Sequence, residues 1–369
     1  MRLNSGGMRP VSRGMWAEAA DLQAAGGRGA LATLIWAQGS APASRWAKLL
    51  VRGDGSRCGT VGGGALEAAV VEAAPEVAAT GRARVLEFDL SPGEAAASGM
   101  ICGGRCAVLV EPVAPERNGE EAVLQVFAAA ARAEAGEEPV VVVTVMAAEG
   151  KARKLAFRQG GGAIGSSGDA EMDRALAEEA RAALEARAPR YAEEPVAAHF
   201  EPVLPYPTLL IFGAGHVAQP LAQMAALAGF RVIVVDDREE FANRERFPTA
   251  DEVVVAEVAE AFGRAQEAVL QEAVLQVEEE SYVVAVTRGH LMDEEVVAQA
   301  LGTPARYIGM IGSRRKVAAV RERLRGRGFG EADLKRVHAP IGLDIGADTV
   351  EEIAVSIVAE LIQERRRGA

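Results

Sequence analysis

A glycine-rich turn that follows a short apolar run carries the clearest chemical pattern in this chain. Gly213, Gly215 and Ala218 fill the pattern G-x-G-x-x-G/A directly after the apolar residues 208–212. Glycine at the first position permits a tight turn, and glycine at the second lets the backbone approach a phosphate closely. A helix that begins near His216 would direct its unpaired N–H groups at the same anion. The turn therefore predicts a phosphate-binding site between a strand and a helix.

Two acidic residues end the next apolar run and complete this pattern. Asp236 and Asp237 follow the run 232–235, and Asp236 lies 23 residues after Gly213. In dinucleotide-binding folds a carboxylate near this spacing meets a ribose hydroxyl group, and it favours NAD over the 2′-phosphorylated dinucleotide. The two strands, the helix and the acid together predict a Rossmann βαβ unit. They do not assign its ligand, because the fold hosts many functions.

Three consecutive glycines form a second loop far upstream. Gly62, Gly63 and Gly64 lie between a short strand-like segment and an amphipathic helical stretch at 65–79. A tight strand-to-helix turn needs one or two glycines, so three favour a loop whose backbone approaches a ligand. The N-terminus of the following helix would again favour an anion.

A cysteine inside a glycine turn is the candidate for sulfur or metal chemistry. Cys102 precedes Gly103 and Gly104, and Arg105 follows closely. A thiol beside a cation gains thiolate character and could bind a metal or meet a sulfur donor, although a buried structural role for Cys102 is equally open. Cys106 begins the next strand and is expected to face the core. The spacing C-x-x-x-C without a nearby histidine falls short of the three protein ligands that a zinc site requires.

Two further segments place polar residues where strands end. His290 follows a strand and could be a base, a ligand or a neighbour of a helix cap. Ser313 is expected to be the N-cap of a helix whose first turn holds Arg314, Arg315 and Lys316. Three cations there oppose the helix dipole, which is easiest to understand if an anion or an acidic partner binds at this point; an exposed, solvated face is the ordinary alternative.

Composition excludes several classes of protein. The 369 residues carry a net charge of −12, whereas a nucleic-acid binder needs a basic face. No run of eighteen apolar residues lacks a charge, so we expect no membrane span, and the first residues lack the apolar core of a signal peptide. Three cysteines are too few for a secreted disulfide scaffold. We therefore expect a cytoplasmic protein with free thiols.

The elements that position these residues predict two domains of the α/β class. The proline-rich residues 190–207 are expected to be a linker between an N-terminal mixed α/β domain at 1–195 and a C-terminal Rossmann-like, doubly wound parallel-sheet domain at 205–369. A direct repeat at 266–277 predicts a crossover helix. In the N-terminal domain strands are expected at 30–37, 47–52, 84–88, 106–113, 140–146 and 155–158, and helices at 65–79, 121–135 and 169–188; in the C-terminal domain strands are expected at Leu209, Val232, Val253, Tyr282 and Tyr307.

The motifs together resemble the xanthine dehydrogenase accessory family of the XdhC type over nearly the whole chain. The resemblance depends on long ordered motifs rather than on one glycine pattern. They are GS-x-P at 39–42, GTVGGG at 59–64, CGG at 102–104, GAGHV at 213–217, Asp237 with Arg238, Gly289 with His290, IGSRRK at 311–316 and HAPIGLDIGA at 338–347.

The resemblance implies a maturation chaperone rather than a catalyst. Its cargo would be the molybdenum cofactor (molybdopterin), which it would protect during sulfuration and deliver to an apo xanthine dehydrogenase-type molybdenum hydroxylase. The expected partners are that hydroxylase, a cysteine desulfurase as sulfur donor and a second copy of the chain in a homo-oligomer. Cys102 would contact the molybdenum, and the glycine loops and helix starts would hold the phosphate and pterin.

Two other functions stay open from the residues alone. An oxidoreductase could bind NAD at the Rossmann turn and use His290 or Asp293 as acid or base. A scaffold could recruit partners without any ligand.

Overall fold

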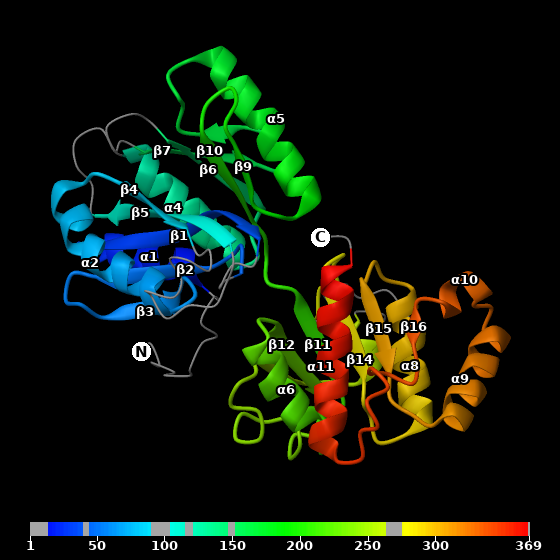
Figure 1. Ribbon diagram of the computed structural model, residues 1–369. Helices are drawn as coiled ribbons and strands as arrows, with labels where there is room; N and C mark the ends of the chain where they lie inside the picture. The colour runs from blue at the N-terminus through cyan, green and yellow to red at the C-terminus, as the bar shows by residue number, and fades with distance from the viewer. Residues whose placement is uncertain are drawn as a thin grey trace. The chain divides into compact units, whose positions relative to one another are not determined.

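The computed structural model describes residues 14–39, 44–89, 104–114, 121–146, 152–262 and 275–367. The chain divides between Pro205 and Tyr206 into two compact units, called here the N-terminal and the C-terminal unit (Figure 1). Both combine helices with sheets, and the C-terminal sheet is parallel throughout, so the predicted fold class is confirmed.

The N-terminal unit contains two five-stranded antiparallel sheets. Sheet A has the order β3-β2-β1-β5-β4, and sheet B has the order β8-β7-β6-β10-β9. The strands of sheet A are β1 (Gly29–Gly39), β2 (Lys48–Arg52), β3 (Arg57–Thr60), β4 (Arg84–Asp89) and β5 (Gly104–Val113); those of sheet B are β6 (Val140–Met146), β7 (Ala152–Arg158), β8 (Ala163–Ile164), β9 (Arg190–Ala192) and β10 (Ala198–Val203).

Helices fill the space between the sheets and cover their outer faces. Helices α1 (Met15–Ala24) and α4 (Glu121–Glu134) share one apolar core with residues of both sheets. Helix α2 (Gly64–Thr80) packs on the other face of sheet A, and α5 (Ala170–Ala186) packs on the other face of sheet B. Asp169 caps α5 because its side chain accepts hydrogen bonds from two backbone N–H groups of the first turn.

The two halves of this unit have the same topology. Within the described residues each half runs helix, three strands, helix, two strands, and the strands take the same order in both sheets. The sequence repeats with the topology: KLLVR at 48–52 matches KLAFR at 154–158, and EPV at 111–113 matches EPV at 201–203. The N-terminal unit is therefore an internal duplication whose two sheets enclose α1 and α4.

Two buried ion pairs connect the two halves reciprocally. Lys48 of β2 pairs with Glu201 of β10, and Lys154 of β7 pairs with Glu111 of β5 at 2.9 Å. Each lysine also donates a hydrogen bond to a threonine of its own sheet, Thr33 at 3.2 Å and Thr144 at 2.7 Å. Trp16 of α1 and Phe127 of α4 meet edge to face between the pairs, with ring centroids 5.3 Å apart.

The predicted linker at 190–207 is wrong, because most of it belongs to sheet B. Residues 190–192 form β9 and residues 198–203 form β10, and the N-terminal unit extends past position 195 to Pro205. Pro202 does not interrupt the sheet, because β9 pairs only with Ala198 to Phe200 and leaves that side of β10 without a partner strand beyond them.

The C-terminal unit is built on a six-stranded sheet with the order β13-β12-β11-β14-β15-β16. Every neighbouring pair is parallel, and in chain order this sequence of strands is 3-2-1-4-5-6, the order of a Rossmann fold. The five predicted strands are confirmed. The strands are β11 (Thr208–Phe212), β12 (Arg231–Asp236), β13 (Glu252–Val255), β14 (Ser281–Ala285), β15 (Tyr307–Met310) and β16 (Val337–His338).

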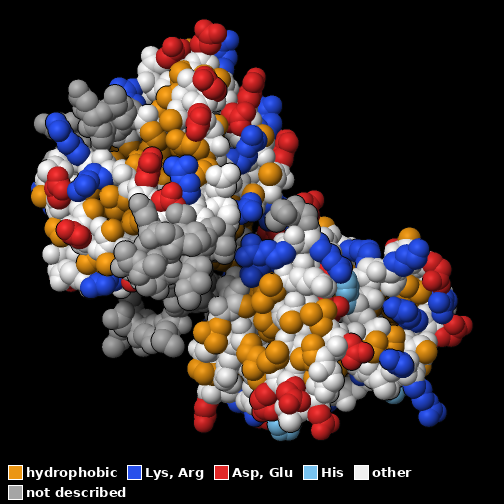
Figure 2. All heavy atoms as spheres, in the orientation of Figure 1, with side chains coloured by type: hydrophobic (Ala, Val, Ile, Leu, Met, Phe, Trp, Pro, Cys, Tyr) orange, Lys and Arg blue, Asp and Glu red, His pale blue; other side chains and the backbone are white. Residues whose placement is uncertain are grey.

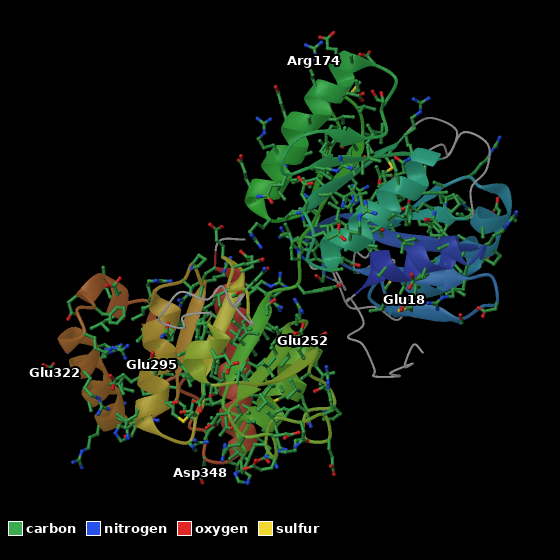
Figure 3. All side chains as sticks on the ribbon, turned by 180° about the vertical axis from the view of Figure 1, so that it is seen from behind. Glu18, Arg174, Glu252, Glu295, Glu322 and Asp348 are labelled. Carbon is green, nitrogen blue, oxygen red and sulfur yellow. The ribbon has the colours of Figure 1, made fainter. Side chains whose placement is uncertain are left out.

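Helices cover both faces of this sheet. Helices α6 (Ala218–Leu227) and α11 (Val350–Arg366) share one core with the sheet, and Figure 2 shows hydrophobic side chains on the surface over these helices. Helices α7 (Val258–Ala261), α8 (His290–Leu301), α9 (Arg314–Gly326) and α10 (Glu331–Leu334) belong to the opposite side; Figure 3 labels Glu295 on α8 and Glu322 on α9. Of the predicted crossover helix at 266–277, residues 266–274 lie outside the described residues.

The reciprocal ion pairs predict how the N-terminal unit responds to the loss of one charge. Lys48→Met leaves Glu201 buried without its cation and should lower the free energy of unfolding by about 3–5 kcal/mol. All three tryptophans lie in this unit, so urea unfolding of the full chain followed by tryptophan fluorescence reports on it. The double variant Lys48→Met/Glu201→Leu should recover most of the loss. Equal unfolding midpoints for wild type and Lys48→Met would contradict the role given to the pair.

Candidate functional site

The carboxyl edge of the C-terminal sheet gathers the motif segments. Because all six strands are parallel, the segments that follow β11, β12, β14, β15 and β16 leave the sheet at one edge. Figure 3 labels Asp348 near this edge and Glu252, the first residue of β13, toward the other edge. The chain turns to opposite sides after β11 and β14, which is where ligands bind in such folds. A small cleft of about 270 Å³ lies there, lined by Gly213, Asp236, Asp237, Thr287, Arg288 and Met292, among others.

The two glycines of the turn have different roles. Gly213 has a φ of +106°, and a Cβ atom on it would lie 2.5 Å from the carbonyl oxygen of Val286, so no other residue fits without a shift of backbone. A Cβ atom on Gly215 would meet nothing within 4 Å. Helix α6 then starts without a side-chain cap at Val217, and His216 beside it is exposed. Gly213 holds the fold, whereas Gly215 leaves open space at a helix N-terminus.

The first acid of the pattern turns back toward the glycine turn. Asp236 accepts a hydrogen bond from the backbone N–H of Ala214 at 2.8 Å and is held by the guanidinium of Arg238 at 2.8 and 3.0 Å. Burial raises the pKa of Asp236, but the hydrogen bonds from Arg238 and Ala214 outweigh it and bring the pKa below its ordinary value. The carboxylate therefore braces the loop that sequence alone assigns to a ligand.

The second acid connects two loops at the point where the chain turns to opposite sides of the sheet. Asp237 receives two hydrogen bonds from Arg288, at 2.8 and 2.7 Å, and so connects the end of β12 with the loop after β14. Arg288 is exposed and Asp237 is half-buried. A ligand that reached Asp237 would have to displace this bidentate pair. The sequence gives no sign of the pairing, because the two residues lie 51 positions apart.

A fully buried acid connects the loops after β14 and β15. Asp293 of α8 has no exposed surface; it accepts hydrogen bonds from the backbone and hydroxyl of Thr287 and forms an ion pair with Lys316 of α9. Lys316 was predicted to face an anion, but its ammonium group is paired with the carboxylate of Asp293. Asp293 acts as a brace.

The start of α9 nonetheless presents two cations. Ser313 is the N-cap, as predicted, since its hydroxyl accepts a hydrogen bond from the N–H of Lys316. Arg314 and Arg315 are exposed, and within the described parts of the chain neither has a partner. His290, the first residue of α8, is exposed as well. The carboxyl edge therefore combines the starts of α6 and α8, which lack a side-chain cap, with two guanidinium groups that have no partner among the described residues.

The three glycines of the N-terminal unit all require glycine. Gly62, Gly63 and Gly64 have φ values of +115°, +73° and +56°, a region that side chains disfavour. Thr60 braces the loop: its hydroxyl accepts a hydrogen bond from Gly62 N–H at 3.1 Å and donates one to Glu67 at 2.8 Å. A Cβ atom on Gly63 would meet nothing within 4 Å, and α2 begins there without a side-chain cap. This loop, too, leaves a helix N-terminus open.

Several strands of sheet A end or begin at the same end of the sheet. Strands β1, β3 and β4 end there and β5 begins there, with Gly104 paired to Gly39. Cys102 and Gly103 lie outside the described residues, immediately before β5. Cys106 is 1% exposed, which confirms that it faces the core, and burial raises its pKa. Cys58 is half-buried, and burial likewise raises its pKa.

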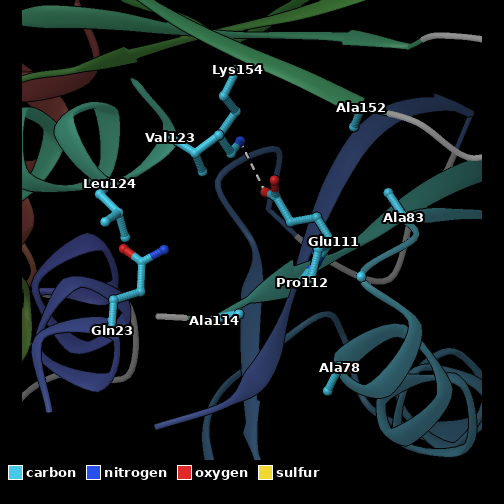
Figure 4. Close-up of a pocket in the computed structure, with 11 residues that line it drawn as sticks. Gln23, Ala78, Ala83, Glu111, Pro112, Ala114, Val123, Leu124, Ala152 and Lys154 are labelled. Carbon is cyan, nitrogen blue, oxygen red and sulfur yellow. Dashed lines mark ion pairs between the residues drawn. The ribbon is translucent and has the colours of Figure 1, made fainter. Parts of the chain in front are cut away.

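The larger cavity lies elsewhere. About 720 Å³ of space in the N-terminal unit, part of it open to solvent, is lined mainly by small apolar residues, with Gln23, Glu111 and Lys154 as its polar groups (Figure 4). Glu111 and Lys154 point toward each other and form the ion pair described above. None of the residues predicted for a site lines this cavity.

Two negative findings concern the described residues only. Among them, no group of three or more His, Cys, Asp or Glu side chains is arranged to hold a metal ion. Their helices include none that is long and apolar enough to span a membrane.

Comparison with known proteins gives two family matches. The XdhC Rossmann domain matches residues 209–361, and the XdhC and CoxI family matches residues 22–89. Together they account for more than half of the chain. The chain belongs to the XdhC and CoxI family.

Individual relatives agree with this placement. YqeB of Escherichia coli strain K12, an uncharacterized protein, is 30% identical over 265 residues, which cover 66% of this chain and 47% of YqeB. This chain thus spans about half of that relative. A probable xanthine dehydrogenase subunit of Bacillus subtilis strain 168 is 27% identical over 342 residues, 92% of this chain and 94% of that protein. A crystal structure of a xanthine dehydrogenase from Bacillus halodurans superimposes with a TM-score of 0.76 at 25% identity, covering 95% of this chain and 96% of that one.

Most of the motif residues lie within the two ranges that match the family. The Rossmann match contains all the carboxyl-edge loops up to residue 361, and the N-terminal match contains Gly62 to Gly64. Cys102 lies outside both matched ranges.

The two glycines of the turn predict opposite results on substitution. Gly215→Val should leave the melting temperature nearly unchanged because its side chain enters open space, yet should weaken pyrophosphate or NAD binding at least tenfold, about 1.4 kcal/mol. Gly213→Ala should lower the melting temperature because of its contact with Val286. Calorimetric titration and thermal melts measure the two effects. Identical titration curves for wild type and Gly215→Val would show that this turn does not bind the phosphate.

Proposed function

We propose that this protein is a maturation accessory protein that carries the molybdenum cofactor to a xanthine dehydrogenase-type molybdenum hydroxylase. The cofactor is cargo: the protein holds it, shields it during sulfuration by a cysteine desulfurase and releases it to the apo-enzyme. The main support is the carboxyl edge, which combines a helix start without a side-chain cap with Arg314 and Arg315, two arginines that have no partner among the described residues. Support also comes from the family and from relatives whose names refer to xanthine dehydrogenase.

The described residues fit the phosphate of this cargo. Gly215 leaves room for an anion at the uncapped start of α6, and Arg314 and Arg315 supply positive charge at the start of α9. Backbone N–H groups at helix starts and guanidinium groups are the usual phosphate ligands in proteins. Arg314 and Arg315 need not break an ion pair to reach an anion, whereas Lys316 would have to leave Asp293.

Taken by itself, the N-terminal unit has a separate candidate contact for a pterin. The exposed backbone around Gly63 suits the flat edge of a pterin, because a ring can approach a chain that lacks side chains. In this proposal Cys102 is the soft ligand for molybdenum. Cys58 and Cys106 are poorer candidates, because burial raises their pKa values and so disfavours the thiolate that binds a metal. The chain itself supplies binding and shielding, and the proposal assigns no proton transfer to it.

A second candidate function is binding of NAD by an oxidoreductase. The strand order 3-2-1-4-5-6 and the cleft at the switch point favour it. The occupied carboxylates count against it, because Asp236 is bound to Ala214 and Arg238 and Asp237 to Arg288. His290 is the candidate acid or base of this function, because Asp293 is fully buried and ion-paired.

Charge reversal at the start of α9 tests the anion site. Arg314→Glu/Arg315→Glu should reduce the molybdenum and pterin that copurify with the protein at least tenfold when it is expressed with cofactor biosynthesis. Both side chains are exposed, so the fold should survive. Arg174→Glu/Arg181→Glu on α5 makes the same change of charge on another exposed helix and should have no effect. Full cofactor content in the α9 variant would exclude this helix start from the site.

Replacement of one thiol tests the proposed contact with the metal. Cys102→Ser keeps the size of the side chain but removes the soft ligand, and should lower the activity and sulfido content of the partner hydroxylase at equal accessory-protein levels. Cys106→Ser, at a buried position, should alter stability more than delivery. A partner of full specific activity matured with Cys102→Ser as the only accessory protein would show that Cys102 has no part in delivery.

A further inference from the structure

Helix α11 carries an apolar stripe on its outer face. Glu351, Val355, Ala359, Ile362 and Arg366 are spaced by four, four, three and four residues, which places them on one face of a helix. Val355 is 46% exposed although it is a large hydrophobic residue, and Ala359 and Ile362 are partly exposed. The inner face of the same helix packs into the core through Ala354, Ile357 and Leu361. Ile362, at the edge of the stripe, also packs against that core with part of its surface, so the stripe is the outer, partly exposed side of a packed helix.

Opposite charges stand at the two ends of this stripe. Glu351 lies in the first turn and Arg366 in the last, and both are exposed. Among the described residues, neither side chain has a hydrogen-bond or ion-pair partner. Each charge also matches the helix dipole at its end.

The order of these residues is self-complementary. If a second α11 is laid antiparallel against the first, Glu351 meets Arg366 of the second copy and Val355 meets its Ile362. Ala359 falls beside the two-fold axis, where a small side chain lets the helices approach closely. The same two contacts then occur twice, as an isologous interface requires.

We propose that α11 forms the centre of a homodimer interface in which two copies of this helix pack antiparallel. Another partner would need an apolar surface with an acid and a base at the same spacing in reverse order, and this chain already has that surface. The proposal concerns the C-terminal unit alone and does not depend on the cofactor.

The neighbouring helix extends the apolar surface. Leu227 at the end of α6 is 62% exposed, and Met224 one turn earlier is partly exposed. The guanidinium of Arg365 donates a hydrogen bond to the carbonyl of Ala228 at 2.9 Å, which keeps the ends of α6 and α11 side by side. Figure 2 shows the hydrophobic side chains that gather over these two helices. An interface centred on α11 would cover them as well.

Sedimentation equilibrium of the full chain tests the interface. Wild type should dimerise, and Val355→Glu should raise the dissociation constant at least tenfold because it places two carboxylates in the apolar centre. Glu351→Arg and Arg366→Glu should each weaken the dimer by creating like-charge contacts, and the double variant Glu351→Arg/Arg366→Glu should restore it. Restoration by the double variant cannot come from misfolding. Glu322→Arg, at an exposed position on α9, is the control; it breaks only a surface ion pair with Arg325 and should leave the dissociation constant unchanged.

Cross-linking locates the axis. Ala359→Cys should give a disulfide-linked dimer on mild oxidation, whereas Ala318→Cys on α9 should give no more of it than wild type. A wild type that stays monomeric at tens of micromolar would overturn the proposal, and so would a dimer unaffected by Val355→Glu. A surface that binds only the apo-hydroxylase, with loss of that complex in Val355→Glu, would overturn it equally.

Discussion

The close approach of Gly213 to the backbone just after β14 is the constraint on which the arrangement of the carboxyl edge depends. A Cβ atom there would lie 2.5 Å from Val286 and 2.9 Å from Thr287, so glycine lets the end of β11 lie directly against the end of β14. The hydroxyl group of Thr287 donates a hydrogen bond to Asp293, and Asp293 forms an ion pair with Lys316 of α9. Because Gly213 has no side chain, a continuous series of contacts connects the loop after β11 with the start of α9, where Arg314 and Arg315 lie.

The N-terminal unit solves a different problem, which is how two similar halves pair in one way. Apolar faces alone would tolerate sliding of α1 and α4, but each buried lysine reaches a glutamate of the other half and a threonine of its own. Buried ion pairs add little net stability because desolvation offsets their attraction. Their value here is in register, since a shift of either half would leave charges buried without partners.

Local patterns predicted the elements well because the strands are apolar runs and the helices have clear starts. Ser313 is the N-cap that the sequence indicates, and the strand expected at 140–146 has those bounds. The prediction of a linker was wrong because prolines at 195, 202, 205 and 207 suggested irregular chain, whereas Pro202 fits in β10 beyond the residues that pair with β9. The duplication left only short matches, KL-x-x-R and EPV, at unequal spacing. The pairs of Asp236 with Ala214 and Asp237 with Arg288 depend on tertiary contact, which no local pattern encodes.

The course of α11 connects the proposed dimer to the position of the carboxyl edges. The helix begins just after the loop that leaves β16 and reaches the opposite edge, where Arg306, just before β15, donates hydrogen bonds to the carbonyl oxygens of Glu364 and Arg367 at 3.2 and 3.1 Å. Seventeen residues of helix span about 25 Å. In an antiparallel pair the two carboxyl edges would therefore lie at opposite ends, about one helix length apart. Each edge would stay open, so two copies could bind ligands or partner enzymes independently while sharing a single apolar interface.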